Sequence, residues 1–134
     1  MNFWRVVTSR LASFLRRVAL AMGAPPQSYV ARKCQGAAWR RAYPASSAAS
    51  IRSFLSLFTN AFAFADSYAL HFAPTDRPMS IYRALYPRLG WSDALEVETL
   101  RDALASRHGI QLGEIWHDEL TLGELFQRTQ PSGG

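Results

Sequence analysis

The stretch from Ser50 to Tyr68 constrains the fold of this chain most, because its apolar side chains recur every three or four residues. That spacing places them on one face of an α-helix, and phenylalanines on one helical face form a core far more often than a cofactor site. Ser47 or Ser50 is suited to cap the helix. The face consists of Ile51, Phe54, Leu55, Phe58, Phe62 and Ala65.

Two further stretches show the same spacing. A short helix is predicted from Met79 to Tyr86, between the prolines of residues 73–78 and Pro87. A last short helix is predicted over residues 120–126, with Thr121 as its N-cap. Residues 130–134 are expected to form a frayed tail.

A third helix is predicted to begin near Ser92 or Asp93 and to end at Gly109. Its expected buried side consists of Leu95, Val97, Leu100, Ala103 and Leu104. Its expected water- or partner-facing side consists of Glu96, Glu98, Arg101 and Asp102. Acidic residues in the first turn also suit the helix dipole.

Charge divides the chain into a basic and an acidic segment. Residues 1–65 contain nine Lys or Arg and no acidic residue, whereas residues 66–134 contain six Arg and ten acidic residues, giving the net charge of +5. Hydrophobic residues make up 49% of the chain, which is enough for a packed core. No stretch approaches the roughly 20 consecutive apolar residues that span a bilayer, so no transmembrane segment is predicted.

Residues 1–22 form a basic amphipathic pattern that is predicted to be helical. Apolar residues recur from Phe3 to Met22, and the interspersed basic residues include Arg5, Arg10, Arg16 and Arg17. Such an Arg-rich, acid-free start is typical of a mitochondrial presequence. A plain surface helix, a helix lying on a membrane surface and an RNA-binding arm are the alternatives.

Residues 24–50 are predicted to be a linker or an extended arm, because they contain Pro25–Pro26, Pro44 and a run of small residues. This arm carries four further cations, Arg32, Lys33, Arg40 and Arg41. The single cysteine, Cys34, excludes a disulfide within the chain.

The segment from Asp93 to Phe126 contains a short motif followed by apolar residues at fixed spacing. Asp93-Ala94-Leu95 lies at the predicted start of the third helix, Leu100 and Leu104 lie within it, Ile110 and Leu112 follow it, and Leu120-Thr121-Leu122 lies at the last helix. Over about forty residues this pattern resembles the acyl carrier proteins, which have Asp-Ser-Leu at the start of their second helix, where this chain has Asp93-Ala94-Leu95.

The resemblance implies an all-α fold, a small three- or four-helix bundle with a basic helical N-terminal extension. The extension would cover residues 1–49 and the carrier-like module residues 50–129. The family attaches phosphopantetheine through the serine of its motif, and Ala94 has no hydroxyl, so no cofactor is expected. Ser92 is the one nearby substitute.

We therefore expect a non-catalytic structural or adaptor subunit of a large assembly, such as a mitochondrial ribosome or respiratory complex. The expected partner-docking residues are Glu96, Glu98, Asp102, Trp91 and Trp116. The basic arm would grip RNA or other subunits. The alternatives are a working carrier modified at Ser92, an RNA-binding ribosomal protein that uses the basic arm, and a bacterial carrier-like protein.

Other chemistry finds little support in the sequence. His71, His108 and His117 form no metal-ligand pair at helical spacing, and His117-Asp118-Glu119 is expected to be a solvated loop. The eight glycines form no phosphate-binding loop. We therefore expect neither a metal site nor an enzyme.

Overall fold

The computed structural model describes residues 23–86 and 95–131 and is all-helical over these ranges, with no strand in either. The helices are α2 (Gln27–Val30), α3 (Gly36–Ala42), α4 (Ala48–Ala61), the 3-10 helix η1 (Asp66–His71), α5 (Pro78–Leu85), α6 (Leu95–His108), α7 (Leu112–Ile115) and α8 (Leu122–Thr129). The prediction of an all-α helical bundle is confirmed.

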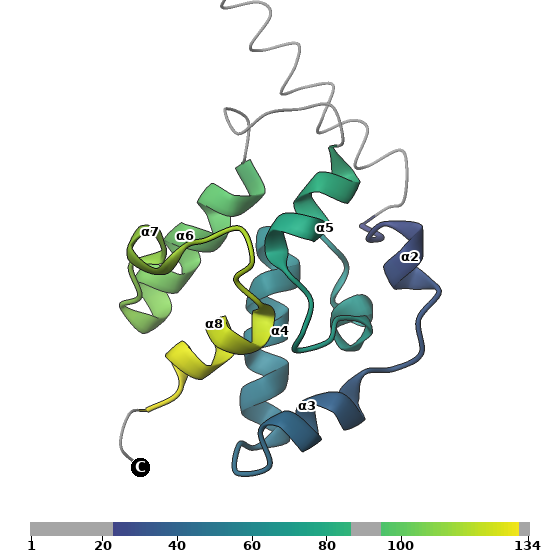
Figure 1. The fold of residues 1–134 in the computed structure, drawn as a ribbon, viewed down its shortest axis with the longest axis horizontal. Coiled ribbons are helices and arrows are strands. Elements are labelled where there is room, and N and C mark those ends of the chain that lie inside the picture. The colour runs from purple at the N-terminus through teal and green to yellow at the C-terminus, as the bar shows by residue number, and fades with distance from the viewer. Residues whose placement is uncertain (1–22, 87–94, 132–134) are drawn as a thin grey trace, which may run out of the picture.

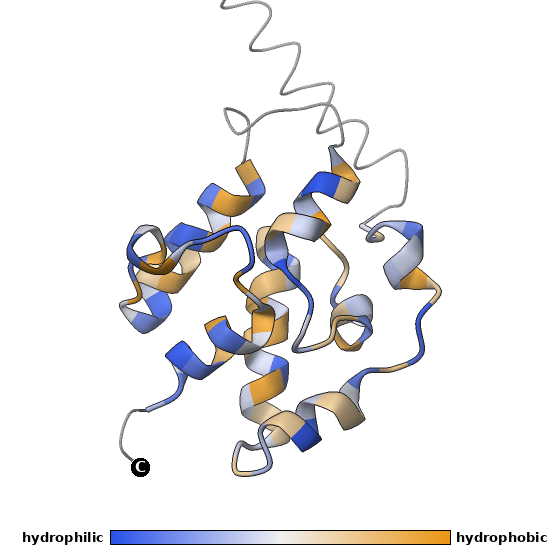
Figure 2. Ribbon diagram, viewed as in Figure 1, coloured by the Kyte–Doolittle hydropathy of each residue, from blue (hydrophilic) through white to orange (hydrophobic). Residues whose placement is uncertain are grey.

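Helix α4 is the centre of the arrangement and contacts η1, α6 and α8. Figure 1 shows it running between α6, α7 and α8 on one side and α2 and α5 on the other, with α3 near its N-terminal end. In Figure 2, α4 is mostly white to orange, whereas α6 and α8 alternate between blue and orange. The central helix is therefore buried on several sides, and the outer helices are buried on one.

Helix α4 begins as predicted but ends earlier. The Ser47 hydroxyl accepts a hydrogen bond from the Ser50 amide at 3.0 Å, which confirms Ser47 as the N-cap. The predicted helix to Tyr68 is wrong, because the backbone of Ala63 turns left-handed at φ 59°. The Ala63 amide donates to Asn60 O and the Phe64 amide to Thr59 O, which is the Schellman pattern of a helix C-terminus.

The core beside α4 is rich in aromatic rings. Phe126 of α8 meets Trp39 edge-on at 5.7 Å between ring centroids and lies at the same distance from Phe54. Further along α4, Phe58 lies 5.2 Å from Phe72. Such edge-on pairs add to the free energy gained by burial alone. The predicted phenylalanine face of α4 is therefore buried, as expected.

The prediction of an extended linker at residues 24–50 is wrong. This segment forms α2 and α3, and the Trp39 side chain is fully buried. Its indole N–H donates to Phe72 O at 2.8 Å, and the Gln35 amide donates to Leu70 O at 2.7 Å. The proline and small-residue pattern indicated a linker, but tertiary contacts of residues distant in sequence hold the segment against η1.

The two short C-terminal predictions are confirmed. Helix α5 begins with Pro78 at its first turn, where a missing amide proton costs nothing. Helix α8 is capped by Thr121, whose hydroxyl accepts from the Glu124 amide at 3.1 Å. Gly123 allows α8 to approach the loop between η1 and α5, since a Cβ there would lie 3.0 Å from Pro74 O.

Candidate docking surface

Helix α6 holds the residues that the sequence singled out for partner binding. Leu100 and Leu104 are fully buried, while Val97 and Ala103 are half-buried. Gly109, at φ 65°, ends the helix as predicted, and its amide donates to Ala105 O at 3.1 Å.

The first turn of α6 is rotated relative to the prediction. Glu96 is only 1% exposed, and its Oε1 accepts a hydrogen bond from the Tyr86 hydroxyl at 2.7 Å. The expectation that Glu96 faces water or a partner is therefore wrong. Leu95, predicted to be buried, is instead 50% exposed. The sequence prediction counted only leucines and other apolar residues as buried. In the structure, Glu96 is buried in the same i, i+4 row as Leu100 and Leu104.

With this rotation, the outward side of α6 carries one leucine at its N-terminal end and two carboxylates. We call this the α6 face and define it as Leu95, Glu98, Thr99 and Asp102, which a helical repeat of 3.6 residues brings to one side. All four are exposed. Thr99 Oγ1 donates to Leu95 O at 2.8 Å, a bond within the helix. Arg101 Nε lies 3.4 Å from Asp102 Oδ1, an exposed pair that offsets part of the acidity.

The remaining predicted docking residues divide into two groups. Trp91, Asp93 and Ala94 lie outside the described residues, so of the Asp-Ala-Leu motif only Leu95 is placed. Trp116 is half-buried and packs against the core.

Four of the eight cations of the predicted basic arm lie among the described residues. Arg5, Arg10, Arg16 and Arg17 lie outside the described residues. Of the other four, Lys33, Arg40 and Arg41 are exposed. Arg32 is the exception, and treating it as a free cation of an arm is wrong, because it belongs to a polar network inside the fold.

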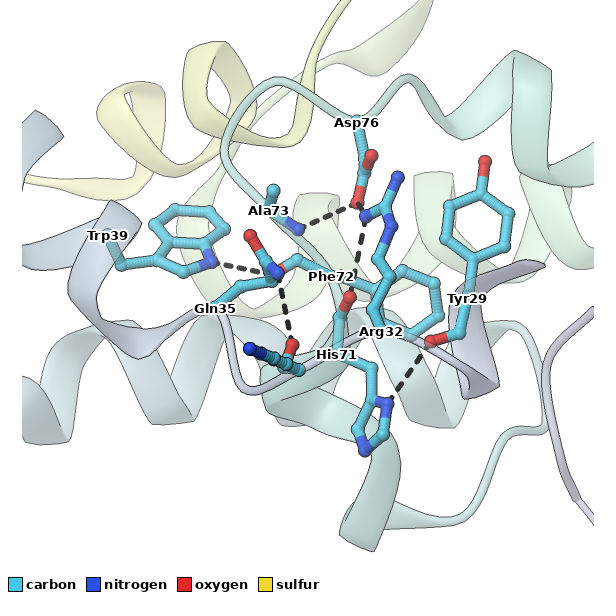
Figure 3. A network of polar contacts seen from close by, with 9 residues as sticks. Tyr29, Arg32, Gln35, Trp39, His71, Phe72, Ala73 and Asp76 are labelled. Carbon is cyan, nitrogen blue, oxygen red and sulfur yellow. Dashed lines mark hydrogen bonds and ion pairs between the residues drawn. The ribbon is translucent and has the colours of Figure 1, made fainter. Parts of the chain in front are cut away.

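This network ties α2 to the loop after η1 (Figure 3). Arg32 Nη1 lies 2.6 Å from Asp76 Oδ2, and Asp76 is only 8% exposed. The Ala73 amide also donates to Asp76 Oδ2, at 2.7 Å. The hydrogen bond to Asp76 raises the pKa of the Arg32 guanidinium. Arg32 also lies over the Tyr29 ring, 4.7 Å from its centroid.

Sequence reasoning missed this network. Asp76 stands between Pro74 and Pro78 in a segment that indicates a loop. His71 adds a further contact to this network, because its ring Nδ1 lies 3.1 Å from Tyr29 O. Nothing in local spacing pairs Asp76 with Arg32, which lies 44 residues earlier. The network therefore has a structural role, and it holds the α2 segment in place.

Residues 23–86 and 95–131 contain no group of three His, Cys, Asp or Glu side chains that could hold a metal ion. His117 Nε2 lies 3.6 Å from Glu124 Oε2, and Asp118 pairs with Arg83 at 3.2 Å. The loop of residues 117–119 is exposed. Cys34 is an exposed free thiol.

No described helix is long and apolar enough to cross a membrane. No family model, curated protein or solved structure matches the chain.

Proposed function

We propose that this chain is a non-catalytic, carrier-like adaptor subunit that binds a basic surface of a partner protein through the α6 face. The observation that carries the proposal is the exposure of Leu95 beside the carboxylates of Glu98 and Asp102. Among the residues described, Leu95 is the one large apolar side chain that is exposed.

The composition of the α6 face suits a protein partner of opposite charge. Fully burying a leucine side chain contributes about 1.5–3 kcal/mol. Leu95 is already half covered, so burying the rest of it contributes less than this and does not hold a partner by itself. The two carboxylates supply charge complementarity, which speeds association and orients the partner. A basic surface with an apolar pocket for Leu95 would satisfy both features.

The non-catalytic part of the proposal rests on Ala94, which replaces the serine that carries phosphopantetheine in the family the segment resembles. The side chain of alanine offers no oxygen for a phosphoryl group. Membership of a mitochondrial assembly stays a prediction, based on the presequence-like residues 1–22.

Affinity isolation of the tagged full chain from its native source tests the proposal. The test variant is Glu98→Lys/Asp102→Lys. Glu114→Lys/Glu119→Lys is the matched control, because it makes the same charge change at two other exposed positions. We expect a reproducible partner with the unaltered chain and the control, and its loss with the test variant.

Retention of the partner by both variants, or its loss from both, would contradict the role of the α6 face. Intact-mass measurement of the isolated chain separates the second part of the proposal. An unmodified mass is expected, whereas a phosphopantetheine adduct would show a working carrier modified elsewhere, such as at Ser92.

A further inference from the structure

A pocket of about 490 Å³ lies on the described surface, and no residue of the α6 face is among its described lining residues. Three parts of the chain form it: the residues around the start of α2, the end of α4 with the residues after it, and the last turn of α5. Its main apolar walls are Pro25, Pro26, Val30, Phe62, Phe64 and Leu85. This volume lies within the range of small-molecule sites, roughly 300–1,000 Å³.

We propose that this pocket binds an uncharged, mostly hydrocarbon small molecule. No charged side chain is among its described lining residues. A charged ligand would lose its hydration there and find no described side chain of opposite charge. The polar side chains that line the pocket are the amide of Gln27 and the hydroxyls of Tyr68 and Tyr86.

The backbone around the pocket also favours an apolar ligand, because several of its amide donors already have partners within the chain. The amides of Phe62 and Phe64 donate to Phe58 O and Thr59 O, and the amide of Tyr86 donates to Tyr82 O. Pro25 and Pro26 have no amide proton at all.

The remaining polar groups are largely occupied as well. Gly23 O accepts from the Ala65 amide at 2.6 Å, and the Tyr86 hydroxyl donates to Glu96 at 2.7 Å. A polar ligand would therefore exchange its hydrogen bonds with water for few replacements, whereas an apolar ligand exchanges water for ring and methyl contacts. A hydroxyl or amide on the ligand would find the side chains of Gln27 and Tyr68 as polar partners.

The left-handed residue that ends α4 also shapes the pocket. Ala63, which lines it, has φ 59°, and it is the one described non-glycine residue with a positive φ. A non-glycine residue in the left-handed region is strained, and such residues gather at ligand sites. The left-handed backbone conformation of Ala63 turns the chain sharply after α4, and Phe64 then lines the pocket.

Part of the pocket lies outside the carrier-like module of residues 50–129, although Phe62, Phe64 and Leu85 belong to that module. Gly23 to Gln27 and Val30 form one wall, and they lie before residue 50, where the resemblance to carrier proteins begins. The inference therefore does not rest on the proposed docking of the α6 face.

Titration of the full chain with N-phenyl-1-naphthylamine, an uncharged dye that fluoresces in apolar surroundings, tests the proposal. We expect saturable binding and at least tenfold weaker binding by Val30→Trp, which fills the pocket. Val97→Trp is the matched control, because it adds the same bulk at a half-buried position on α6, outside the lining. Circular dichroism and thermal unfolding establish that each variant folds.

Leu85→Ala is a second pocket variant, which enlarges the site instead of filling it and is expected to change dye affinity at least threefold. Displacement by decanol, decanoate and decylammonium tests the chemical class. Decanol should displace the dye at concentrations at least tenfold lower than either charged analogue.

Three results would overturn the proposal: no saturable dye binding, equal binding by Val30→Trp and the unaltered chain, or equal displacement by the three analogues. A fourth would identify another occupant. If Val18→Asp/Met22→Asp bound the dye and the unaltered chain did not, the apolar residues of the chain's own N-terminal segment would fill the pocket.

Discussion

Residues 23–76 and residues 95–131 form their parts of the core in different ways. The first region packs aromatic rings, with Trp39, Phe54 and Phe58 at or near full burial, and ties them with long-range polar contacts such as Arg32–Asp76. The second region packs leucines, including Leu100 and Leu104, on helices with local caps and stops.

The difference shows where local sequence is sufficient to specify structure. Helices α2 and α3 have four and seven residues, and helices this short do not persist in water by themselves. Contacts with η1 and α8 must fix them. Helix α6 has 14 residues, an acidic first turn and a glycine stop, so its own sequence favours it.

The largest expected effect comes from Trp39→Ala. Removing a fully buried indole and its hydrogen bond to Phe72 O is expected to lower the free energy of unfolding by about 3–5 kcal/mol. Leu104→Ala in the other region should lower it by about 2–5 kcal/mol. Urea unfolding measures both, with the exposed Arg40→Ala as control. An unchanged midpoint for Trp39→Ala would mean that residues 24–49 are a separate appendage after all.

The next largest effect is expected from removing the Arg32–Asp76 ion pair of the first region. Arg32→Ala leaves the carboxylate of Asp76, 8% exposed, without its cation and is expected to destabilise the fold by about 1–3 kcal/mol. Arg52→Ala is the matched control, because its partner Asp66 is 3.9 Å away and both side chains are at least half exposed. The control should change the free energy of unfolding by less than about 0.5 kcal/mol. Equal effects in chemical denaturation would refute a structural role for the network.

Helices α4 and α6 both end at a residue with a left-handed backbone, Ala63 and Gly109, so opposite substitutions can be compared at the two positions. Ala63→Gly, after α4, should raise the free energy of unfolding by about 1 kcal/mol, because glycine adopts positive φ without strain. Gly109→Ala, after α6, should lower it by a similar amount, and no atom lies within 4 Å of the added Cβ to complicate the comparison. Thermal unfolding of both variants provides the check, and changes of the same sign would contradict the backbone explanation.

The smallest expected effect is a fall in the free energy of unfolding at alkaline pH, which originates in the first region. Burial raises the pKa of Tyr29 and of Tyr43 above the ordinary value of 10.0. As the pH rises through about 10, the unfolded chain loses these protons before the folded chain does, so the free energy of unfolding falls. Below that pH the contribution is fully present. Denaturation at pH 8 to 11 should show a shallower fall for Tyr29→Phe/Tyr43→Phe; an identical slope would count against this origin.

The outcome of the sequence predictions follows the same division. Ser47, Thr121 and Gly109 were recognised because capping depends on residues within one helical turn. The left-handed Ala63 was missed because glycine usually marks such a stop. Residues 24–50 were mistaken for a linker because the partners of Trp39 and Arg32 lie more than 30 residues away in the sequence.

The candidate site shows the same limit on a smaller scale. Glu98 and Asp102 were correctly expected to be exposed. Leu95 and Glu96 exchanged their expected positions, since polarity predicts a buried leucine and an exposed glutamate. The hydrogen bond from Tyr86 compensates the burial of Glu96, and helical spacing alone contains no information about it.

Site-specific photo-crosslinking in the native source tests the central claim, that the α6 face binds a partner, most directly. A photoreactive phenylalanine would replace Leu95 in one full-length chain and Glu114, an exposed residue of α7, in another. The account predicts that position 95 crosslinks to one partner protein through a basic segment and that position 114 does not. Absence of a crosslink at position 95, or the same products at both positions, would contradict it.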